Sequence, residues 1–163
     1  MIPKDLPTLR TRYRSLLEGA SSLPTEADAD LCQEAAKLAE ALLHDPWDEV
    51  VLHGDLHHDN IQGSSRGWLA IDPKGIRGER TYDFANWFYN PAGERGRVED
   101  RTRVEWTANH LAEHRALDYR RLLAFSMTYG CLSACWAQED GQNPAPALAV
   151  ARILEKLVIN SSS

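Results

Sequence analysis

The sequence predicts an α+β protein that is mostly α-helical, with a small β cluster in the middle of one domain. Its 163 residues fit a single domain, which usually has about 100–200 residues. Apolar residues recur at helical spacing toward both ends of the chain. Between them, short apolar runs are flanked by turn residues, a pattern typical of strands.

Two helices are predicted before the β cluster. In the first, the apolar positions are Leu6, Leu9, Tyr13, Leu16 and Leu17, and Gly19 ends the pattern. The second is capped by Thr25 or a nearby aspartate and ends before Pro46. Its apolar face consists of Leu31, Ala35, Leu38, Ala39, Leu42 and Leu43. A short buried strand is then expected over Val50–Leu52.

A hairpin and four helices are predicted after this strand. The hairpin pairs Asn60–Gln62 with Trp68–Ile71 through a Gly- and Ser-rich turn. A short helix over Tyr82–Tyr89 stops before Pro91, and residues 92–103 form an exposed loop that runs into the next helix. Asn143 and Pro144 suit a helix start. The last three helices are expected at roughly Val98–Glu113, Tyr119–Gln138 and Pro146–Val158.

The composition excludes several classes of protein. A net charge of −6 argues against general nucleic-acid binding, which needs a basic face. Charged residues interrupt any N-terminal signal sequence. The uncharged stretch from Leu122 to Gln138 is too short and polar to span a membrane, so we expect a buried helix. Cys32, Cys131 and Cys135 form no Cys-x-x-Cys pair and fit reduced thiols, so a cytoplasmic protein without membrane partners is expected.

Two segments, 53–60 and 71–75, carry most of the chemical information. Asp55, Asn60 and Asp72 offer oxygen ligands spaced five and then twelve residues apart. Mg²⁺ prefers one or two carboxylates together with substrate phosphates and water. Phosphoryl transfer needs such a site beside a further carboxylate that orients the attacking hydroxyl. The two segments therefore point to phosphoryl transfer.

The residue pattern of these two segments resembles that of a known family. His53-Gly54-Asp55-Leu56-His57-x-x-Asn60, followed by Ile71-Asp72-Pro73, resembles the aminoglycoside phosphotransferases, which are relatives of the protein kinases. Residues 51–60 and 67–75 together are similar to the streptomycin 6-phosphotransferase branch, often grouped as aminoglycoside and hydroxyurea resistance kinases. The resemblance implies a protein-kinase-like C-terminal lobe whose small β hairpin carries the catalytic loop and the metal aspartate.

The resemblance also implies a role for each motif residue, with ATP and Mg²⁺ as cofactors. Asp55 matches the catalytic aspartate that takes or orients the proton of the acceptor hydroxyl. Asn60 and Asp72 match the two Mg²⁺ ligands. His57 stands where protein kinases carry a lysine that contacts the transferring phosphate. Lys74 is expected to offset phosphate charge of the nucleotide, although a surface lysine in a tight turn explains it equally well.

Four neighbouring residues are assigned less directly. His53 matches a histidine that braces the catalytic loop, and Asp83 matches an aspartate that holds this loop by hydrogen bonds from the following helix. His58 has no assigned role. The Asp59 carboxylate is either exposed to solvent or an additional group behind the site, and the sequence leaves both alternatives open.

The resemblance covers nearly the whole chain but only one lobe of such a kinase. Residues 1–163 correspond to the C-terminal lobe, and no glycine-rich cover or strand lysine precedes His53. The N-terminal nucleotide-binding lobe is therefore expected to be absent. The chain is accordingly a fragment, a truncated gene product or a protein that has lost nucleotide binding, and we expect it to be inactive or poorly active alone.

The function expected is ATP-dependent phosphorylation of a hydroxyl on a streptomycin-like aminoglycoside, giving antibiotic resistance. An acidic acceptor cleft would suit such a polycation, although ordinary helix surface or core explains each candidate more simply. These candidates are Asp118, Glu139, Asp140, Trp106 and Trp136. One alternative is a non-catalytic remnant or interaction module that oligomerises through its exposed lobe-facing surface. A metallohydrolase is a further alternative, suggested by the closeness of His53, Asp55, His57, His58 and Asp59.

Overall fold

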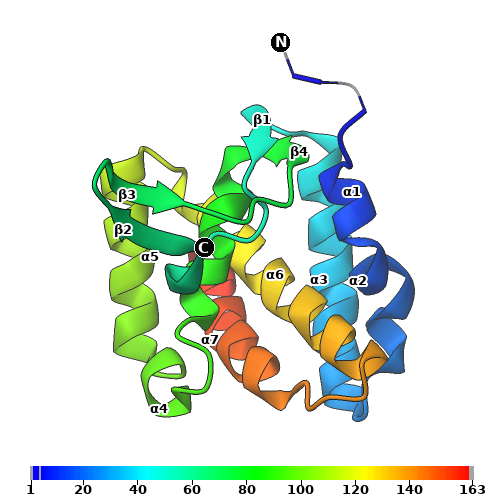
Figure 1. Cartoon of the computed structure of the whole chain (residues 1–163). Helices are drawn as coiled ribbons and strands as arrows, with labels where there is room; N and C mark the ends of the chain where they lie inside the picture. Colours follow the sequence, from blue (N-terminus) through cyan, green and yellow to red (C-terminus); the bar gives the residue numbers. More distant parts are fainter. Residues whose placement is uncertain (1, 4, 162–163) are drawn as a thin grey trace.

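The computed structural model describes residues 2–3 and 5–161, most of them in helices (Figure 1). The N-terminal half contains α1 (Leu9–Arg12), α2 (Arg14–Gly19), η1 (Ala20–Ser22), α3 (Glu26–His44), β1 (Glu49–Leu52), η2 (His58–Asn60), β2 (Ile61–Ser64), β3 (Gly67–Ala70) and β4 (Ile76–Glu79). The C-terminal half contains η3 (Arg80–Tyr89), α4 (Arg95–Val98), α5 (Arg101–Arg115), α6 (Tyr119–Glu139) and α7 (Ala145–Ser161). The mostly helical α+β class predicted from the sequence is confirmed.

Helix α6 is the centre of the core. It crosses the middle of the molecule, with α3 and α2 on one side and α7 packed along it (Figure 1). Every residue from Leu122 to Leu132 is buried, as the uncharged sequence predicts for an internal helix. Cys131 and Cys135 are free, buried thiols within it. Among the described residues, no helix has the length and apolar character needed to cross a membrane.

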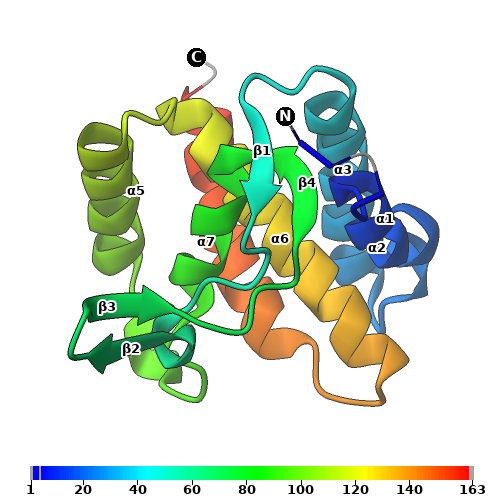
Figure 2. The same cartoon turned by 45° about the horizontal axis from the view of Figure 1, so that its top comes forward.

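Two separate pairs of antiparallel strands frame the motif segments. Strand β1 pairs with β4, so that Leu52 lies opposite Ile76. Strand β2 pairs with β3 in the predicted hairpin, each strand being displaced by one residue from the expected start. Figure 2 shows the hairpin on the side of α5, while β1 and β4 lie nearer to α1 and α3. The chain crosses between these two strand pairs twice, once through residues 53–60 and once through residues 71–75.

Three expectations about individual elements are wrong in detail. The first predicted helix is divided at Tyr13, whose buried phenol packs inward and shares a 2.8 Å hydrogen bond with the Thr128 hydroxyl. Strand β4 is an additional element, because Gly78 and Glu79 hide the apolar pattern of a strand. The short helix predicted over Tyr82–Tyr89, by contrast, is present as the 3₁₀-helix η3. Within the loop expected over residues 92–103, α4 forms one short turn of helix.

The helix caps largely follow the sequence. Thr25 accepts a hydrogen bond from the Asp28 amide at the start of α3, as predicted. Asn143 accepts one from the Ala145 amide at the start of α7. Asp100 and Asp118 cap α5 and α6 in the same way. These caps fix where each helix begins, and hence the lengths of the connections around the site.

Candidate active site

The catalytic-loop segment is held in place through its main chain. The amide nitrogens of His53 and Gly54 donate to the two carboxylate oxygens of Asp83, each over 2.8 Å. Asp83 thereby satisfies two consecutive backbone donors that would otherwise be unpaired where β1 ends. This geometry agrees with the bracing role expected for Asp83.

The His53 ring connects the two motif segments. Its Nε2 lies 2.8 Å from the carbonyl oxygen of Ile71, and its Nδ1 lies 3.3 Å from the amide nitrogen of Asp55. Since the Asp55 amide donates, Nδ1 accepts, and the proton of a neutral ring lies on Nε2. The His53 carbonyl also accepts a hydrogen bond from the Lys74 amide over 2.7 Å. One residue therefore fixes the position of Asp72 relative to Asp55, which is the expected bracing role.

The 3₁₀ geometry of η3 brings an unexpected residue to the site. Residues three apart eclipse one another in a 3₁₀-helix, so Asn86 lies on the same side as Asp83. Asn86 Nδ2 donates to Asp55 Oδ1 over 3.3 Å, and Asn90 Nδ2 donates to Asn86 Oδ1 over 2.8 Å. The opposite face of η3 packs into the core through Tyr82, Ala85 and Phe88. The sequence predicted a short helix here without its type, so it gave no signal for the position of Asn86.

Asn60 uses its amide nitrogen within the loop. Its Nδ2 donates to the Asp55 carbonyl over 2.9 Å and lies 3.2 Å from His57 Nε2. The carboxamide oxygen makes no hydrogen bond among the described residues, so it is available to a cation. His57 Nε2 is 3.9 Å from Asp55 Oδ1. Asp55, His57 and Asn60 are therefore brought together.

Asp72 and Asp55 share a cationic neighbour. Lys74 Nζ is 2.9 Å from Asp72 Oδ2 and 3.6 Å from Asp55 Oδ2. Asp72 is a non-glycine residue with φ of 55°, a conformation that aspartate tolerates better than most residues. An ammonium group between two carboxylates marks a position where positive charge is favourable. Asp72 and Asp55 thus flank a place where positive charge is favourable.

The pKa values of the charged groups follow their surroundings. The hydrogen bond from Lys74 lowers the pKa of Asp72, and the hydrogen bond to Asp72 raises the pKa of Lys74. Burial raises the pKa of Asp83, an effect that the amides of Gly54 and His53 partly oppose. Asp72 and Lys74 are therefore charged at neutral pH.

His57, His58 and Asp59 also form a group of potential metal ligands. One ligand atom from each lies within 4.8 Å of the others, and no other such trio occurs among the His, Cys, Asp and Glu residues that the structure describes. His58 Nε2 is 3.3 Å from an oxygen of Asp59, which is 71% exposed. Asp59 therefore points to solvent, one of the two alternatives left open. The group includes neither Asp55 nor Asp72.

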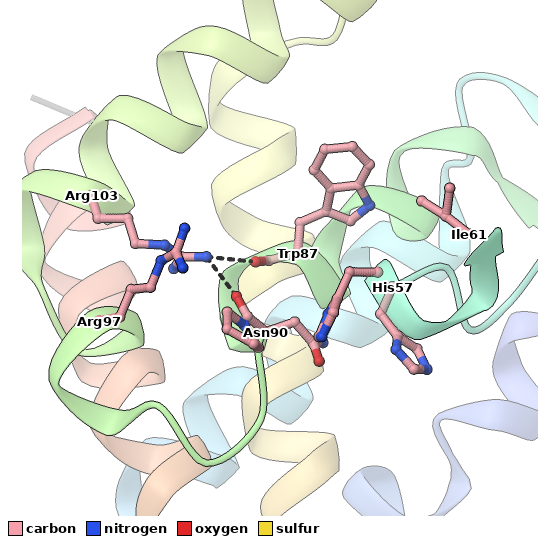
Figure 3. A pocket seen from close by; sticks show the side chains of 8 residues that line it. His57, Ile61, Trp87, Asn90, Arg97 and Arg103 are labelled. Carbon is pink, nitrogen blue, oxygen red and sulfur yellow. Dashed lines mark hydrogen bonds between the residues drawn. The ribbon is translucent and has the colours of Figure 1, made fainter. Parts of the chain in front are cut away.

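A cavity of about 340 Å³ opens beside the loop and is lined by His57, His58, Ile61, Trp87, Asn90, Pro91, Arg97 and Arg103 (Figure 3). Its Arg103 donates to the carbonyl oxygens of Trp87 and Asn90, over 3.2 and 2.6 Å. Arg97 Nη1 lies 3.6 Å from a carboxylate oxygen of Glu94. Both arginines of this cavity therefore already have partners.

The residues considered for an acidic acceptor cleft do not all come together. Asp118 caps the first turn of α6, whereas Glu139 is its last residue. A helix of 21 residues is about 30 Å long, so these carboxylates lie at opposite ends. Trp106 is 63% exposed on α5, stacked on His110. Trp136 lies under the guanidinium of Arg12.

Comparison with known proteins identifies the family. Residues 1–141 match the model of the aminoglycoside/hydroxyurea antibiotic resistance kinases. The chain belongs to this family, which confirms the resemblance drawn from the two motif segments.

Three relatives illustrate the breadth of this family. The streptomycin 3''-kinase of Klebsiella pneumoniae is 36% identical over 149 residues, covering 85% of this chain and 52% of the relative. The hydroxyurea phosphotransferase of Kitasatospora aureofaciens is 30% identical, covering 84% and 39%. The streptomycin 6-kinase of Streptomyces griseus is 33% identical, covering 83% and 45%. The chain spans about half the length of these curated relatives. No solved structure matches it.

Proposed function

We propose that this chain supplies the catalytic loop and the Mg²⁺ ligands for ATP-dependent phosphorylation of a hydroxyl on a streptomycin-like aminoglycoside. The observation that carries this proposal is the gathering of Asp55, Asn60 and Asp72 at the ends of two strand pairs. Lys74 lies between the two carboxylates, where a metal ion would also be attracted. The names of the relatives supply the acceptor class.

Each residue then has a defined task. Asp55, held by Asn86, accepts the proton of the acceptor hydroxyl through its carboxylate. Asp72 and the free carboxamide oxygen of Asn60 hold Mg²⁺, which when bound neutralises charge on the nucleotide phosphates. His57 would donate toward the transferring phosphate, and Lys74 would offset phosphate charge of the nucleotide.

We further propose that the chain needs an additional segment to cover the nucleotide. Kinases of this kind enclose ATP with a glycine-rich strand pair and a strand lysine. Neither feature occurs in the part of the chain that the structure describes. Phosphoryl transfer by the 163-residue polypeptide alone is therefore expected to be slow or undetectable.

The test uses a chimera in which the N-terminal half of the Klebsiella pneumoniae streptomycin 3''-kinase precedes this chain. Radiolabelled ATP, Mg²⁺ and streptomycin are supplied, and labelled antibiotic is measured. The chimera is expected to transfer phosphate, whereas the chain alone is not. Asp55→Asn in the chimera should lower the rate about 10²–10⁴-fold, the usual contribution of a general base.

Asp59→Asn serves as the matched control, since this carboxylate belongs to the same loop but is exposed. It should retain most of the activity. A chimera that works equally well with Asn at position 55 would exclude the assigned mechanism. Transfer by the isolated chain, abolished by Asp55→Ala, would instead exclude the need for a covering segment.

The alternative of a non-catalytic interaction module has a separate observation in its favour. Val51 on β1 and Trp68 on β3 are 51% and 79% exposed, which is unusual for apolar side chains of this size. Such a module is expected to self-associate through these exposed side chains. Gel filtration that gives a monomer at high concentration, for the unmodified chain and for Trp68→Ser alike, would count against it.

A further inference from the structure

His57, His58 and Asp59 have the spacing of ligands around a metal ion. The proposed reaction assigns no task to His58 or to Asp59. Ligand atoms from all three residues lie within 4.8 Å of one another. His57 Nδ1 is 3.6 Å from Asp59 Oδ2, and His58 Nε2 is 3.3 Å from Asp59 Oδ1. Nitrogen and oxygen ligands at about 2.0–2.2 Å from a tetrahedral zinc ion lie roughly 3.3 Å apart, so two of the three pairs are already close to that spacing.

The Nδ1 atom of His57 gives a second reason to expect a ligand. This atom is buried and makes no hydrogen bond among the described residues. On the other side of the ring, Nε2 lies 3.2 Å from Asn60 Nδ2. A buried polar atom without a partner is unfavourable, and a bound ion would satisfy it. The unpaired nitrogen is the one that faces the Asp59 carboxylate.

The charge and the exposure of the other two ligands also favour a cation. Within the described part of the chain, no lysine or arginine lies within ion-pair distance of Asp59, whereas Asp72 is paired with Lys74. The side chains of His58 and Asp59 are 52% and 71% exposed, so an ion reaches them from solvent. Two adjustable ligands can therefore close on an ion beside the more rigidly held His57.

We propose that His57, His58 and Asp59 form a second cation site, which binds a divalent transition metal of the zinc class. Two imidazoles with one carboxylate suit Zn²⁺, Co²⁺ or Ni²⁺, whereas Mg²⁺ prefers oxygen ligands. Water would fill the fourth position of a tetrahedral ion. The ligands of this site include neither Asp55, Asn60 nor Asp72, so the two kinds of ion do not compete for the same atoms.

Occupancy of this site has a consequence for the catalytic loop. Asn60 Nδ2 donates to the Asp55 carbonyl, so it is a donor that faces His57 Nε2, and the proton of the neutral ring lies on Nδ1. A metal ion on Nδ1 takes the place of this proton, and the neutral ring then has its proton on Nε2. There the proton lies between Asn60 Nδ2, which repels it, and Asp55 Oδ1, 3.9 Å from the nitrogen. Opposition to phosphoryl transfer by the bound ion rests on the proposed function, whereas its binding does not.

The test measures Zn²⁺ binding to the full chain, without a histidine tag, by calorimetry in the absence of Mg²⁺ and nucleotide. His58→Gln and Asp59→Asn should each raise Kd about tenfold or more, since even groups behind a metal ligand usually contribute about 10–100-fold. Both side chains are exposed, so both variants are expected to fold. The transfer assay of the proposed function contains Mg²⁺ and no zinc, so Asp59→Asn remains a control there.

The matched control is the double variant His110→Gln with His114→Gln. These two histidines are one turn apart on α5, with ring centres 4.1 Å from each other, and two histidines at this helical spacing can bind zinc. The double variant should leave the Kd of the tightest Zn²⁺ site within twofold. A large excess of Mg²⁺ should also leave Zn²⁺ bound.

Nitrogen NMR of the chain with ¹⁵N-labelled histidine identifies the ligand atom. Zn²⁺ should shift the Nδ1 resonance of His57 and place the ring proton on Nε2, and His58→Gln should need more Zn²⁺ for the same change. The inference is overturned if the unmodified chain binds no Zn²⁺ at submillimolar concentration, if the double variant is the one that loses binding, or if Mg²⁺ displaces the ion. None of these measurements requires phosphate transfer, so their failure is distinguishable from failure of the proposed function.

Discussion

Asp83 determines the shape of the catalytic loop although it takes no part in the proposed chemistry. Its two carboxylate oxygens accept from consecutive backbone amides, those of His53 and Gly54. An asparagine has the same shape but only one accepting oxygen, and its NH₂ group would face a second donor.

Asp83→Asn is therefore expected to destabilise the fold by about 1–3 kcal/mol, the usual penalty for leaving a buried donor unpaired. Urea unfolding followed by circular dichroism measures this change. Asp59→Asn, an exposed position in the neighbouring loop, should change the free energy of unfolding by less than about 0.5 kcal/mol. Equal effects of the two substitutions would contradict the role given to Asp83.

The same residue gives the stability a specific pH dependence. Because burial raises the pKa of Asp83, the folded chain keeps this proton at pH values where the unfolded chain has already released it. The unfolding free energy contributed by Asp83 is then full below the ordinary carboxyl pKa of 3.8 and falls as the pH rises through the folded pKa. Relative to Asp83→Asn, the unmodified chain should lose stability as the pH rises from 3.8. An unfolding series from pH 3.5 to 7 measures the difference, and an increasing advantage of the unmodified chain would reverse the predicted sign.

At the scale of elements, η3 shows where reasoning from sequence succeeded and where it failed. A short helix ending before Pro91 was predictable from its apolar residues and the following proline. Its 3₁₀ character was not, because the same residues suit either helix and the choice depends on packing against α6. As a result, Asp83 was found through the family motif, whereas Asn86 was missed.

The turn after β1 depends on a glycine for two separate reasons. Gly54 has a φ of 81°, and a Cβ added there would lie 2.7 Å from Ile76 Cδ1. Gly67, in the turn of the β2–β3 hairpin, has a φ of 96° but open space around it. The two glycines share the conformational requirement and differ in the contact.

Gly67→Ala is expected to lower the free energy of unfolding by about 1 kcal/mol, through backbone strain alone. Gly54→Ala adds overpacking against β4, which usually costs a further 1–3 kcal/mol or so. Thermal unfolding of both variants measures the difference. If both lost the same stability, close packing between the loop and β4 would be excluded.

At the scale of the whole molecule, a buried ion pair joins distant parts of the chain. Arg121 on α6 donates to Glu79 on β4, with a closest distance of 2.6 Å, and also to the carbonyls of Leu42 and Asp45. The Glu79 side chain is only 2% exposed. This contact explains why β4 was not predicted. A glutamate is expected at the surface, and the arginine that pairs with it lies 42 positions later in the sequence.

Arg121→Met is expected to destabilise the fold by about 3–5 kcal/mol, because Glu79 would remain buried without its partner. Arg10→Gln breaks an exposed pair and should leave the free energy of unfolding nearly unchanged. Denaturant midpoints measure both changes, and Arg121→Met combined with Glu79→Leu should recover part of the loss. Failure of the double variant to recover would indicate that the arginine acts mainly through the two carbonyls.

The closeness of the motif residues, in contrast, was predictable from the sequence because their spacing is local. Asp55, Asn60 and Asp72 lie within 18 positions, in the connections on either side of a hairpin that is itself a local structure. Arg12 gave no such signal, since only the fold brings α1 to Trp136 and Lys74. Local motifs are thus enough to predict a chemistry, whereas a contact such as that between Arg12 and Trp136 is known only from the fold.

The way the β2–β3 hairpin is attached has a consequence for changes in its length. Asn60 and Ile71 are joined by a 2.9 Å backbone hydrogen bond at its base, and His53 holds Ile71 from the other side. The strands beyond this base are mostly exposed. Residues added at the Ser64–Gly67 turn would therefore lengthen the hairpin outward without altering the separation of Asp55 and Asp72. The hairpin tip is thus a natural attachment point for a label or an affinity tag, and a place where related chains are free to differ in length.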